Sequence, residues 1–515
     1  MSASPTPLQA PAEHLDVVVV GAGLSGIGAG YRLQTERPGK SYAILEARDA
    51  IGGTWDLFRY PGIRSDSDMF TLGYPFEPWR EAKSIADGPS ILRYVQETAA
   101  KHGIEDKIRF NTKVLSADWS TEAALWTLTL EHRGPEGTST STLTCDFLYS
   151  CAGYYNYDHG HEPEFPGIES FQGQVVRPQF WPEDLDYAGK KVVVIGSGAT
   201  AVTIVPAMTE GEGAASHVTM LQRTPTWISA VPGSDKIADK VREKLPPRLA
   251  HKLIRSKNIA MSIGIYQFCQ RRPEQAKKML LGLTTKILGD EKLVAEHFTP
   301  PYNPWDQRLC AVPDADFFKA MKAGRAEVVT DHIDRFVPEG IKLLSGKVLE
   351  ADVVVTATGL QLLAFGGIEP TVDGEEVVLS DQFVWRGAMI TALPNFAICI
   401  GYTNASWTLR ADLTSRLVCK VLNWMDRNDY AAVVPNPTEE LTARPLLDLA
   451  AGYVQRSIGA FPRQSDHGVW RVRQNYVLDA ATTMRTNLRK TLAVTPRSAV
   501  RRSATVEPEL VGAAS

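Results

Sequence analysis

The stretch VVVVGAGLSG, residues 17–26, decides the fold of this chain. Four valines that end at a glycine are typical of a buried parallel strand followed by a tight turn. The small residues 27–33 that come next predict a helix. A GxGxxG turn between a strand and a helix brings backbone amides close to a pyrophosphate at the positive end of the helix dipole. The sequence therefore predicts a dinucleotide site made by Gly21, Gly23, Ser25 and Gly26.

An acidic residue stands where such a site needs one. Residues 42–45 predict the next strand, and Glu46 follows it directly, twenty residues past Gly26. A carboxylate at this distance accepts hydrogen bonds from the two ribose hydroxyls of an adenine dinucleotide. A surface glutamate that merely follows a strand is the alternative. The spacing favours the dinucleotide interpretation.

A second strand, turn and helix are predicted from the sequence VVVIGSGATA, residues 192–201. The residues of the turn and the start of its helix are Gly196, Gly198, Ala199, Thr200 and Ala201. Arg223 and Thr224 follow the partner strand, and Arg223 stands twenty-two residues past the turn, where the first unit has its acid. An arginine pairs with a ribose 2′-phosphate, which an acid would repel, so the pattern favours NADPH over NADH. An arginine that only caps a strand at the surface is the alternative.

Two such units predict an α/β fold of two doubly wound, Rossmann-like dinucleotide-binding domains. At 515 residues the chain is also too long for a single core. We expect residues 1–155 and 383–515 to form the first domain and residues 156–382 to form the second, with a helical insertion near 230–330. The last thirty residues are basic and poor in large apolar groups, which predicts a loose tail.

The composition excludes several classes of protein. The 55 Lys and Arg against 59 Asp and Glu give a net charge of −4, whereas a dedicated nucleic-acid binder carries a strong basic excess. Six scattered cysteines, without a CxxC or a His/Cys cluster, predict neither a zinc site nor a disulfide scaffold. The N-terminus lacks the pattern of a signal peptide, and no stretch reaches the roughly 20 apolar residues of a membrane-spanning helix. We expect a soluble, cytoplasmic protein.

Two dinucleotide sites in one chain imply electron transfer between two cofactors. The usual pair is FAD in the first site and a nicotinamide in the second. A disulfide reductase of this layout needs a redox-active cysteine pair near the flavin, and no two cysteines are spaced for it. Molecular oxygen is therefore the favoured electron acceptor.

Three further motifs resemble those of Baeyer–Villiger monooxygenases. The first joins GTW at 53–55, YPG at 60–62 and Asp66; the second runs through 171–182; the third is ATG at 357–359. The resemblance covers residues 14–480 and is greatest to the ethionamide-activating subgroup of that family. One departure is Arg177, a position at which the family normally carries histidine.

The resemblance implies an activity and its cofactors. Members of the family bind FAD tightly, reduce it with NADPH and form a flavin peroxide at carbon 4a with O2. The peroxide attacks a ketone carbonyl, and migration of a carbon substituent gives an ester or a lactone. A small lipophilic ketone is the expected substrate, and a second activity would be the oxygenation of sulfides or thioamides.

The resemblance also assigns site residues. Arg308 matches the active-site arginine, whose fixed charge would keep the peroxide deprotonated, and Asp66 matches its ion-pair partner. A buried salt bridge that only fixes a loop is the alternative for this pair. Gln307 replaces a lysine that many relatives aim at the 2′-phosphate, so NADPH selectivity would depend on Arg223 and Thr224. The cofactor would also be bound by Gly53, Thr54 and Trp55.

Three alternatives stay open. An N- or S-oxygenating flavin monooxygenase has a similar layout, although the motif that ends at Asp66 argues against it, as does Arg308. A non-catalytic nicotinamide sensor would keep the same fold. An NADPH oxidase without productive oxygen transfer is kept open by Arg177, because loss of the family histidine is expected to disturb cofactor positioning.

One stretch is strongly basic. Residues 236–257 hold eight Lys or Arg against two acids. A helix of this kind can contact an anionic membrane surface, but a solvated helix face is the more common meaning of such a run. We therefore expect no membrane partner here.

Aromatic and histidine residues outside these motifs carry less information. Tyr154, Tyr155 and Tyr157 predict packing at a hinge between the domains. Trp407 would line the substrate cavity by resemblance, or else belong to the core. His159 and His161 lie in a loop without a third ligand nearby, so no metal site is expected.

Overall fold

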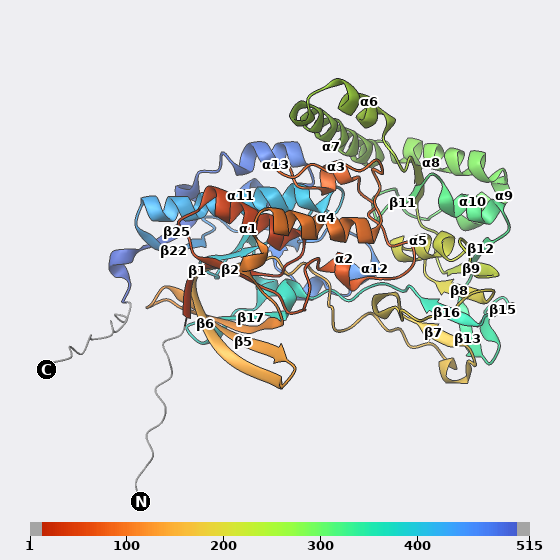
Figure 1. The fold of residues 1–515 in the computed structure, drawn as a ribbon, viewed down its shortest axis with the longest axis horizontal. Helices are drawn as coiled ribbons and strands as arrows, with labels where there is room; N and C mark the ends of the chain where they lie inside the picture. Colours follow the sequence, from red (N-terminus) through yellow and green to blue (C-terminus); the bar gives the residue numbers. More distant parts are fainter. Residues whose placement is uncertain (1–12, 502–515) are drawn as a thin grey trace, which may run out of the picture.

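Strand β1 (Glu13–Val20) lies in the middle of the larger of two main sheets. Its residues 17–19 are fully buried, and it pairs in parallel with β2 (Tyr42–Leu45) on one side and with β6 (Gly137–Ser150) on the other. Covering of both faces explains why this strand is apolar without interruption. The computed structural model, which describes residues 13–501, thus contains the predicted first unit, with helix α1 (Leu24–Glu36) after the glycine turn (Figure 1).

The larger sheet has eleven strands from three separate parts of the chain. Besides β1, β2 and β6 they are β3 (Ile108–Arg109), β4 (Thr112–Ser120), β5 (Leu125–Gly134), β17 (Glu369–Val372), β18 (Glu375–Glu376), β19 (Val384–Trp385), β20 (Met389–Ile390) and β21 (Phe396–Ile398). Strands β4, β5 and β6 pair antiparallel in this order, and apolar and polar residues alternate along them.

The chain returns from the second main sheet to the first at an earlier residue than we predicted. Strand β17 pairs in parallel with β4, with Glu369 opposite Ser116. The prediction assigned all of residues 156–382 to the second domain, whereas this pairing puts residues 369–376 in the first sheet. A strand of four residues carries too little pattern to tell which of two sheets it joins, because strand preference depends on its neighbours.

The second main sheet is entirely parallel, in the order β12-β9-β8-β16-β7. Its strands are β7 (Gln174–Val176), β8 (Lys191–Ile195), β9 (His217–Gln222), β12 (Ala326–Thr330) and β16 (Val353–Thr356). Helix α5 (Ala199–Ala207) follows the turn after β8, as the sequence predicted. Short strands outside the two main sheets are β10 (Ile228–Val231), β11 (Cys310–Pro313), β13 (Ile333–Val337), β14 (Gly340–Leu343), β15 (Val348–Glu350), β23 (Arg444–Pro445) and β24 (Arg463–Gln464).

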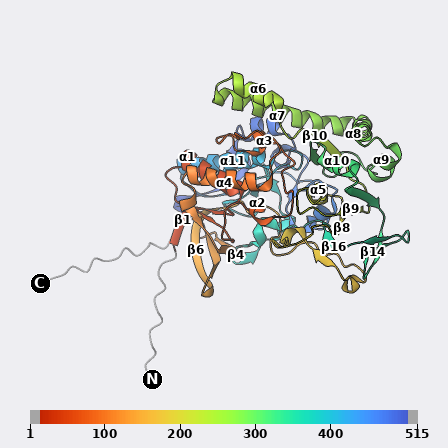
Figure 2. The ribbon, with the colours of Figure 1, turned by 45° about the vertical axis from the view of Figure 1, so that its right-hand side comes forward.

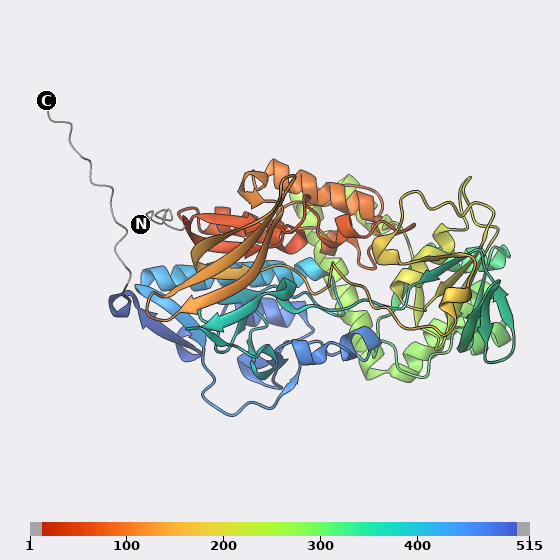
Figure 3. The same cartoon turned by 90° about the horizontal axis from the view of Figure 1, so that it is seen from below.

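The two sheets and their glycine turns confirm the predicted α/β class with two doubly wound units. The segments that form the first sheet and those that form the second occupy opposite ends of the long axis (Figure 3). The remaining helices outside residues 236–322 are α2 (Thr54–Leu57), α3 (Met69–Leu72), α4 (Gly88–Lys101), α11 (Trp407–Arg427), α12 (Gly452–Gln455) and α13 (Tyr476–Thr483).

The predicted helical insertion is present. It consists of α6 (Lys236–Lys244), α7 (Pro247–Arg271), α8 (Pro273–Leu288), α9 (Glu291–His297) and α10 (Asp316–Lys322). Helix α7 is held against residues 70–73, because the buried Arg255 donates hydrogen bonds to the carbonyls of Phe70 and Gly73, both at 2.8 Å. Within residues 13–501, every helix is too short or too polar to span a membrane.

The end of the chain is more ordered than predicted. We expected the last thirty residues to be a loose tail, but strand β25 (Leu492–Pro496) pairs antiparallel with β22 (Tyr430–Pro435). The apolar positions of β25 are too few to stand out in a basic segment, and its order depends on the partner strand and on the burial of Leu492 in the core. The rest of the predicted tail, residues 502–515, lies outside the described residues.

Candidate active site

A cavity of about 1170 Å³ is lined by residues from both main sheets. The carboxyl ends of β1 and β2 reach it from the first sheet, and those of β8 and β9 reach it from the second. Ligands of doubly wound folds bind at this end of the strands. All the residues predicted to bind cofactor or substrate line the cavity except Gly26 and Ala201, which are buried in the packing behind it.

The first glycine turn is closely packed. Gly21 has a positive φ of 99°, and a Cβ at this position would lie 2.9 Å from the carbonyl oxygen of Cys151. A Cβ at Gly26 would lie 1.8 Å from the carbonyl oxygen of Gly21, which allows only glycine where the helix approaches the strand. Gly23 is free to face the cavity, with Gly53 from the GTW loop beside it. The turn therefore presents backbone rather than side chains to a ligand.

Glu46 is buried at the edge of this turn. Its carboxylate accepts hydrogen bonds from the backbone amides of Ala22 at 2.7 Å and Arg48 at 3.0 Å. Burial raises the pKa of Glu46 above its ordinary value, against the effect of these two hydrogen bonds. A buried carboxylate that faces a cavity is suited to accept from ribose hydroxyls. The residues around the first turn thus fit the adenosine and pyrophosphate of a dinucleotide such as FAD.

The second glycine turn is more open at its second glycine only. Gly196 again has a positive φ, of 135°, and a Cβ there would lie 2.3 Å from the carbonyl oxygen of Ala357. At Gly198, in contrast, a Cβ would meet nothing within 4 Å. Arg223 is exposed at the wall of the cavity and has no ion-pair partner among residues 13–501. An unpaired guanidinium beside an open turn fits a dinucleotide with a 2′-phosphate.

Arg308 lies deep in the molecule, and it lines the cavity. Its Nη2 donates a hydrogen bond to the Tyr154 hydroxyl at 3.3 Å. In the described part of the chain no carboxylate lies within 4.0 Å of its guanidinium. Burial works against the charge, but the surrounding phenols more than compensate, so the pKa of Arg308 lies above its ordinary value. The cavity therefore contains a cation that is not neutralised by direct ion pairing.

Asp66 faces the same cavity but is not in contact with Arg308 as an ion pair. Burial raises the pKa of its carboxyl, while the charges of Arg308 and Arg64 and the amide of Ala311 lower it in part. Arg64 is committed elsewhere, because it forms an ion pair with Asp316. The predicted direct pair of Asp66 and Arg308 is thus a longer-range interaction in this structure.

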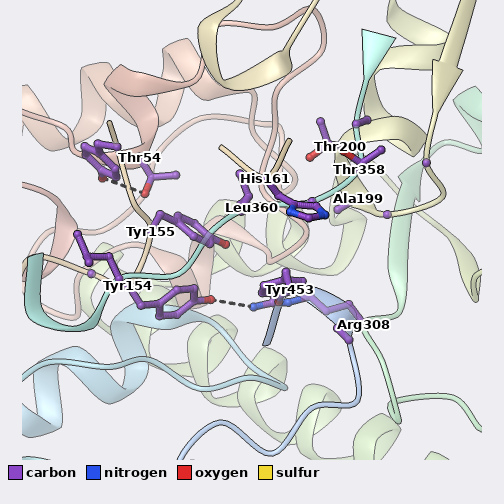
Figure 4. A pocket seen from close by; sticks show the side chains of 18 of the residues that line it. Thr54, Tyr154, Tyr155, His161, Ala199, Thr200, Arg308, Thr358, Leu360 and Tyr453 are labelled. Atoms are coloured by element: carbon purple, nitrogen blue, oxygen red, sulfur yellow. Dashed lines mark hydrogen bonds between the residues drawn. The ribbon is translucent and has the colours of Figure 1, made fainter. Parts of the chain in front are cut away.

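Three tyrosines surround Arg308, and the sequence had not assigned them to the site. Tyr154 and Tyr155 were expected to pack at a hinge, and Tyr453 carried no recognisable pattern. Figure 4 shows the Tyr154 hydroxyl directed at Arg308, with Tyr453 beside the guanidinium. The rings of Tyr154 and Tyr155 meet edge to face, with centroids 4.7 Å apart. The run YYNYD could have indicated the first two, whereas nothing in the sequence around Tyr453 sets it apart.

Trp407 joins the cavity wall to the first turn. It lines the cavity, and its indole Nε1 donates to Ser25 Oγ at 2.7 Å. Its ring also lies 5.2 Å from that of Tyr154. The GTW loop is held in a similar way, because Thr54 and Tyr157 share a hydrogen bond of 3.3 Å. Both contacts connect the walls of the cavity to the backbone that surrounds the first turn.

Arg177 lies outside the main cavity. It forms an ion pair of 2.5 Å with Glu162, and both side chains are about half exposed. The same residue borders a small pocket with His161 and Thr200, and both of these also line the main cavity. Arg177 thus stands in the segment between β7 and β8 of the second sheet, next to the second turn rather than at Arg308.

Two cysteines from distant segments meet beside the first turn. Cys151 follows β6 and Cys399 follows β21, and these strands pair with Ile398 opposite Ser150. Both are buried free thiols, and Cys151 lines the cavity. Cysteine spacing in the sequence therefore does not exclude a thiol pair at this site. No group of three or more His, Cys, Asp or Glu within residues 13–501 is arranged to hold a metal ion.

The chain is similar to known proteins over nearly its whole length. It is 52% identical over 468 residues to the "FAD-containing monooxygenase EthA" of Mycobacterium tuberculosis, which covers 91% of this chain and 94% of that protein. It is 46% identical over 470 residues to the "Probable FAD-binding monooxygenase AlmA" of Acinetobacter baylyi, with 91% and 93% covered. A family model described as flavin-binding monooxygenase-like matches residues 74–236, and one described as an NAD(P)-binding Rossmann-like domain matches residues 19–85.

Solved structures share the fold at low sequence identity. A steroid monooxygenase bound to NADP is 21% identical with a TM-score of 0.72, covering 94% of this chain and 100% of that one. A complex of OTEMO with FAD and NADP is 23% identical with a TM-score of 0.68, covering 83% and 87%. At this level of identity, the two structures show that the fold is shared.

Proposed function

Because this chain belongs to the family of FAD-containing monooxygenases, we propose that it inserts one oxygen atom next to the carbonyl of a ketone, using NADPH and O2. The reaction would convert a ketone, O2, NADPH and a proton into an ester or lactone, water and NADP⁺. A small lipophilic ketone is the proposed substrate, since Leu72, Leu363 and Trp407 are among the residues that line the cavity.

We assign FAD to the first turn and NADPH to the second. The buried Glu46 and the close packing of Gly26 support a tightly held FAD, and the exposed Arg223 supports NADPH. A solved structure of the same fold is described as a complex with FAD and NADP. When bound, FAD would supply the chemistry that transfers electrons from NADPH to O2.

The observation that carries the ketone reaction is the position of Arg308. Its guanidinium is always charged, faces the cavity and has no carboxylate from residues 13–501 in ion-pair contact. Negative charge on oxygen during attack on a carbonyl is stabilised most by a fixed cation in a site that excludes water. The hydroxyl of Tyr154 orients the guanidinium, and Asp66 would tune its charge from a greater distance.

The test is the variant Arg308→Ala, assayed with a cyclic ketone and with an aryl sulfide. Loss of the cation should lower the rate of ketone oxygenation by about 100-fold or more, because a single preorganised charge partner is worth that much. Sulfide oxygenation should fall much less, since it places less negative charge on the transferred oxygen. Products are measured by gas chromatography against NADPH consumed, with Arg308→Lys as the variant that keeps the charge.

Flavin content and NADPH-dependent bleaching of each variant show whether its cofactor sites are intact. Unchanged ketone oxygenation in a flavin-loaded Arg308→Ala variant would contradict the proposed role. A wild-type protein that oxygenates sulfides but no ketone would favour an S-oxygenating enzyme. Stoichiometric hydrogen peroxide with every substrate would favour an NADPH oxidase.

A further inference from the structure

Helices α6, α7 and α8 carry an unusual share of exposed apolar side chains. Among residues 13–501, sixteen large apolar side chains are exposed, and seven of them belong to these three helices. They are Ile237, Leu249, Leu253, Met261, Ile265, Met279 and Leu283. Exposed apolar residues that occur singly are ordinary, but a group on one structural unit indicates an interaction site. We call the solvent-facing side of α6, α7 and α8 the helical ledge; Figure 2 shows it along one edge of the molecule.

Leu249 and Leu253, near the start of α7, cannot turn inward. The opposite side of the helix is fixed by the buried residues Ile254, Arg255 and Ile259. Arg255 donates to two backbone carbonyls of the first part of the chain, so rotation of the helix would leave a buried guanidinium without partners. Leu249 and Leu253 are four residues apart and therefore share one side of the helix. This side has no cover within the described chain.

Cations lie next to the apolar residues. Of the eight Lys and Arg in residues 236–257, three are engaged within the protein: Arg242 and Arg255 bind backbone carbonyls, and Lys257 pairs with Asp235. The other five are exposed, and none has an ion-pair partner within 4.0 Å in the described part of the chain. They are Lys236, Lys240, Lys244, Arg248 and Lys252. The structure thus separates the cations that stabilise the fold from those available to a partner.

We propose that the helical ledge docks peripherally on an anionic lipid bilayer. Leucine, isoleucine and methionine side chains enter the boundary between headgroups and acyl chains, while lysine and arginine stay with the anionic headgroups. A second copy of this chain fits the same surface less well. Two ledges placed face to face would bring like charges together, at a cost that lipid headgroups of opposite charge do not have.

The position of the helical ledge would serve a lipophilic substrate, a consequence that depends on the proposed function. The inner side of α7 packs close to the cavity wall, where Ile259 shares an apolar cluster with Tyr402, and Tyr402 lines the cavity. Farther along, the ring of Tyr266 lies 5.7 Å from that of Trp305, in the segment that leads to Arg308. A ketone dissolved in the bilayer would thus be close to the reaction site.

The test measures binding of the flavin-loaded protein to vesicles by flotation, without any assay of turnover. Vesicles of equimolar phosphatidylcholine and phosphatidylglycerol should bind the protein at least about tenfold more tightly than phosphatidylcholine alone, and salt should weaken the binding. The double variant Lys252→Glu with Leu253→Ser should lower this binding by about tenfold or more. A matched control, Lys347→Glu with Leu344→Ser, changes the same residue types at exposed positions of the turn between β14 and β15 and should bind as wild type does.

Two results would overturn the proposal. One is equal binding of the wild type to neutral and anionic vesicles, or no binding to either. The other is a dimer in sedimentation velocity that Leu253→Ser dissociates, because the ledge would then be covered by a second copy. Neither result depends on ketone oxygenation, so vesicle binding and the proposed activity can fail separately.

Discussion

The two glycine turns follow nearly the same sequence pattern but differ in how they are packed. At the first turn, a Cβ on Gly23 would contact Gly53 at 3.5 Å, and Glu46 is buried behind the strand. At the second, Gly198 borders open space and Arg223 is exposed. A closed site with a buried acid suits a cofactor that stays bound, whereas an open site with an unpaired cation suits one that binds and leaves in each cycle. The same local motif can thus bind one cofactor permanently and another only briefly, depending on the residues that surround the motif.

The largest expected effect comes from a substitution that adds one methyl group to a glycine of each turn. Gly26→Ala would place a Cβ 1.8 Å from the carbonyl oxygen of Gly21 and should destabilise the fold by about 3 kcal/mol or more, with loss of flavin. Gly198→Ala has space and an ordinary φ of −77°, so its stability should change by less than about 0.5 kcal/mol. Thermal unfolding and flavin absorbance measure both. Equal stability of the two variants would remove the contrast between the turns.

The next largest effect is expected when the charged residue beside each turn is replaced by glutamine. Glu46→Gln should weaken flavin binding by about 100-fold, because a buried ionic acceptor is lost, and leave the KM for NADPH little changed. Arg223→Gln should keep the flavin and raise the KM for NADPH by about tenfold, without raising that for NADH. Ultrafiltration of the flavin and initial rates with both nucleotides measure these changes. A loss of flavin from Arg223→Gln would contradict the assignment of the sites.

A smaller effect concerns Asp66, which lies between the turns. Burial raises the pKa of its carboxyl, so the folded apoprotein holds the proton more tightly than the unfolded chain. The stability that this group contributes is present below its unfolded pKa of about 4 and is lost as the pH rises. Asp66→Asn should therefore raise the Tm of the apoprotein by a few degrees at neutral pH, with a gain that vanishes near pH 4.

The control for Asp66 is Asp331→Asn. Hydrogen bonds from Ser345 and His332 lower the pKa of Asp331, so its ionised form stabilises the fold at neutral pH. This substitution should therefore give no gain in Tm at neutral pH. A gain for both variants would indicate a general effect of net charge rather than the burial of Asp66.

The smallest effect is expected at Arg177, which stands where the family carries histidine. The ion pair with Glu162 is about half exposed, and such pairs contribute roughly 0–1 kcal/mol. Arg177→His should thus leave the Tm nearly unchanged and change the hydrogen peroxide formed per NADPH by less than about threefold. A large fall in peroxide would show that the arginine impairs coupling and would favour the oxidase interpretation.

Much of the fold could be predicted because its decisive elements are contiguous. The two strand, turn and helix units and the helical insertion were all expected from local pattern. The exceptions are short strands that depend on a partner: β17 joins the first sheet through β4, and β25 pairs with β22. A strand of four or five residues has almost no preference of its own, so the partner decides where it belongs.

The sequence by itself determined where both turns lie and which charge stands beside each, because one strand, turn and helix unit of roughly 30 residues contains all that the motif needs. Only the tertiary structure decided that Tyr154 and Tyr453 surround Arg308, that Cys151 meets Cys399, and that Leu253 stays exposed beside cations without an ion-pair partner among residues 13–501. Periodicity indicates that a side chain is apolar or charged, but contacts between distant segments determine what, if anything, covers it.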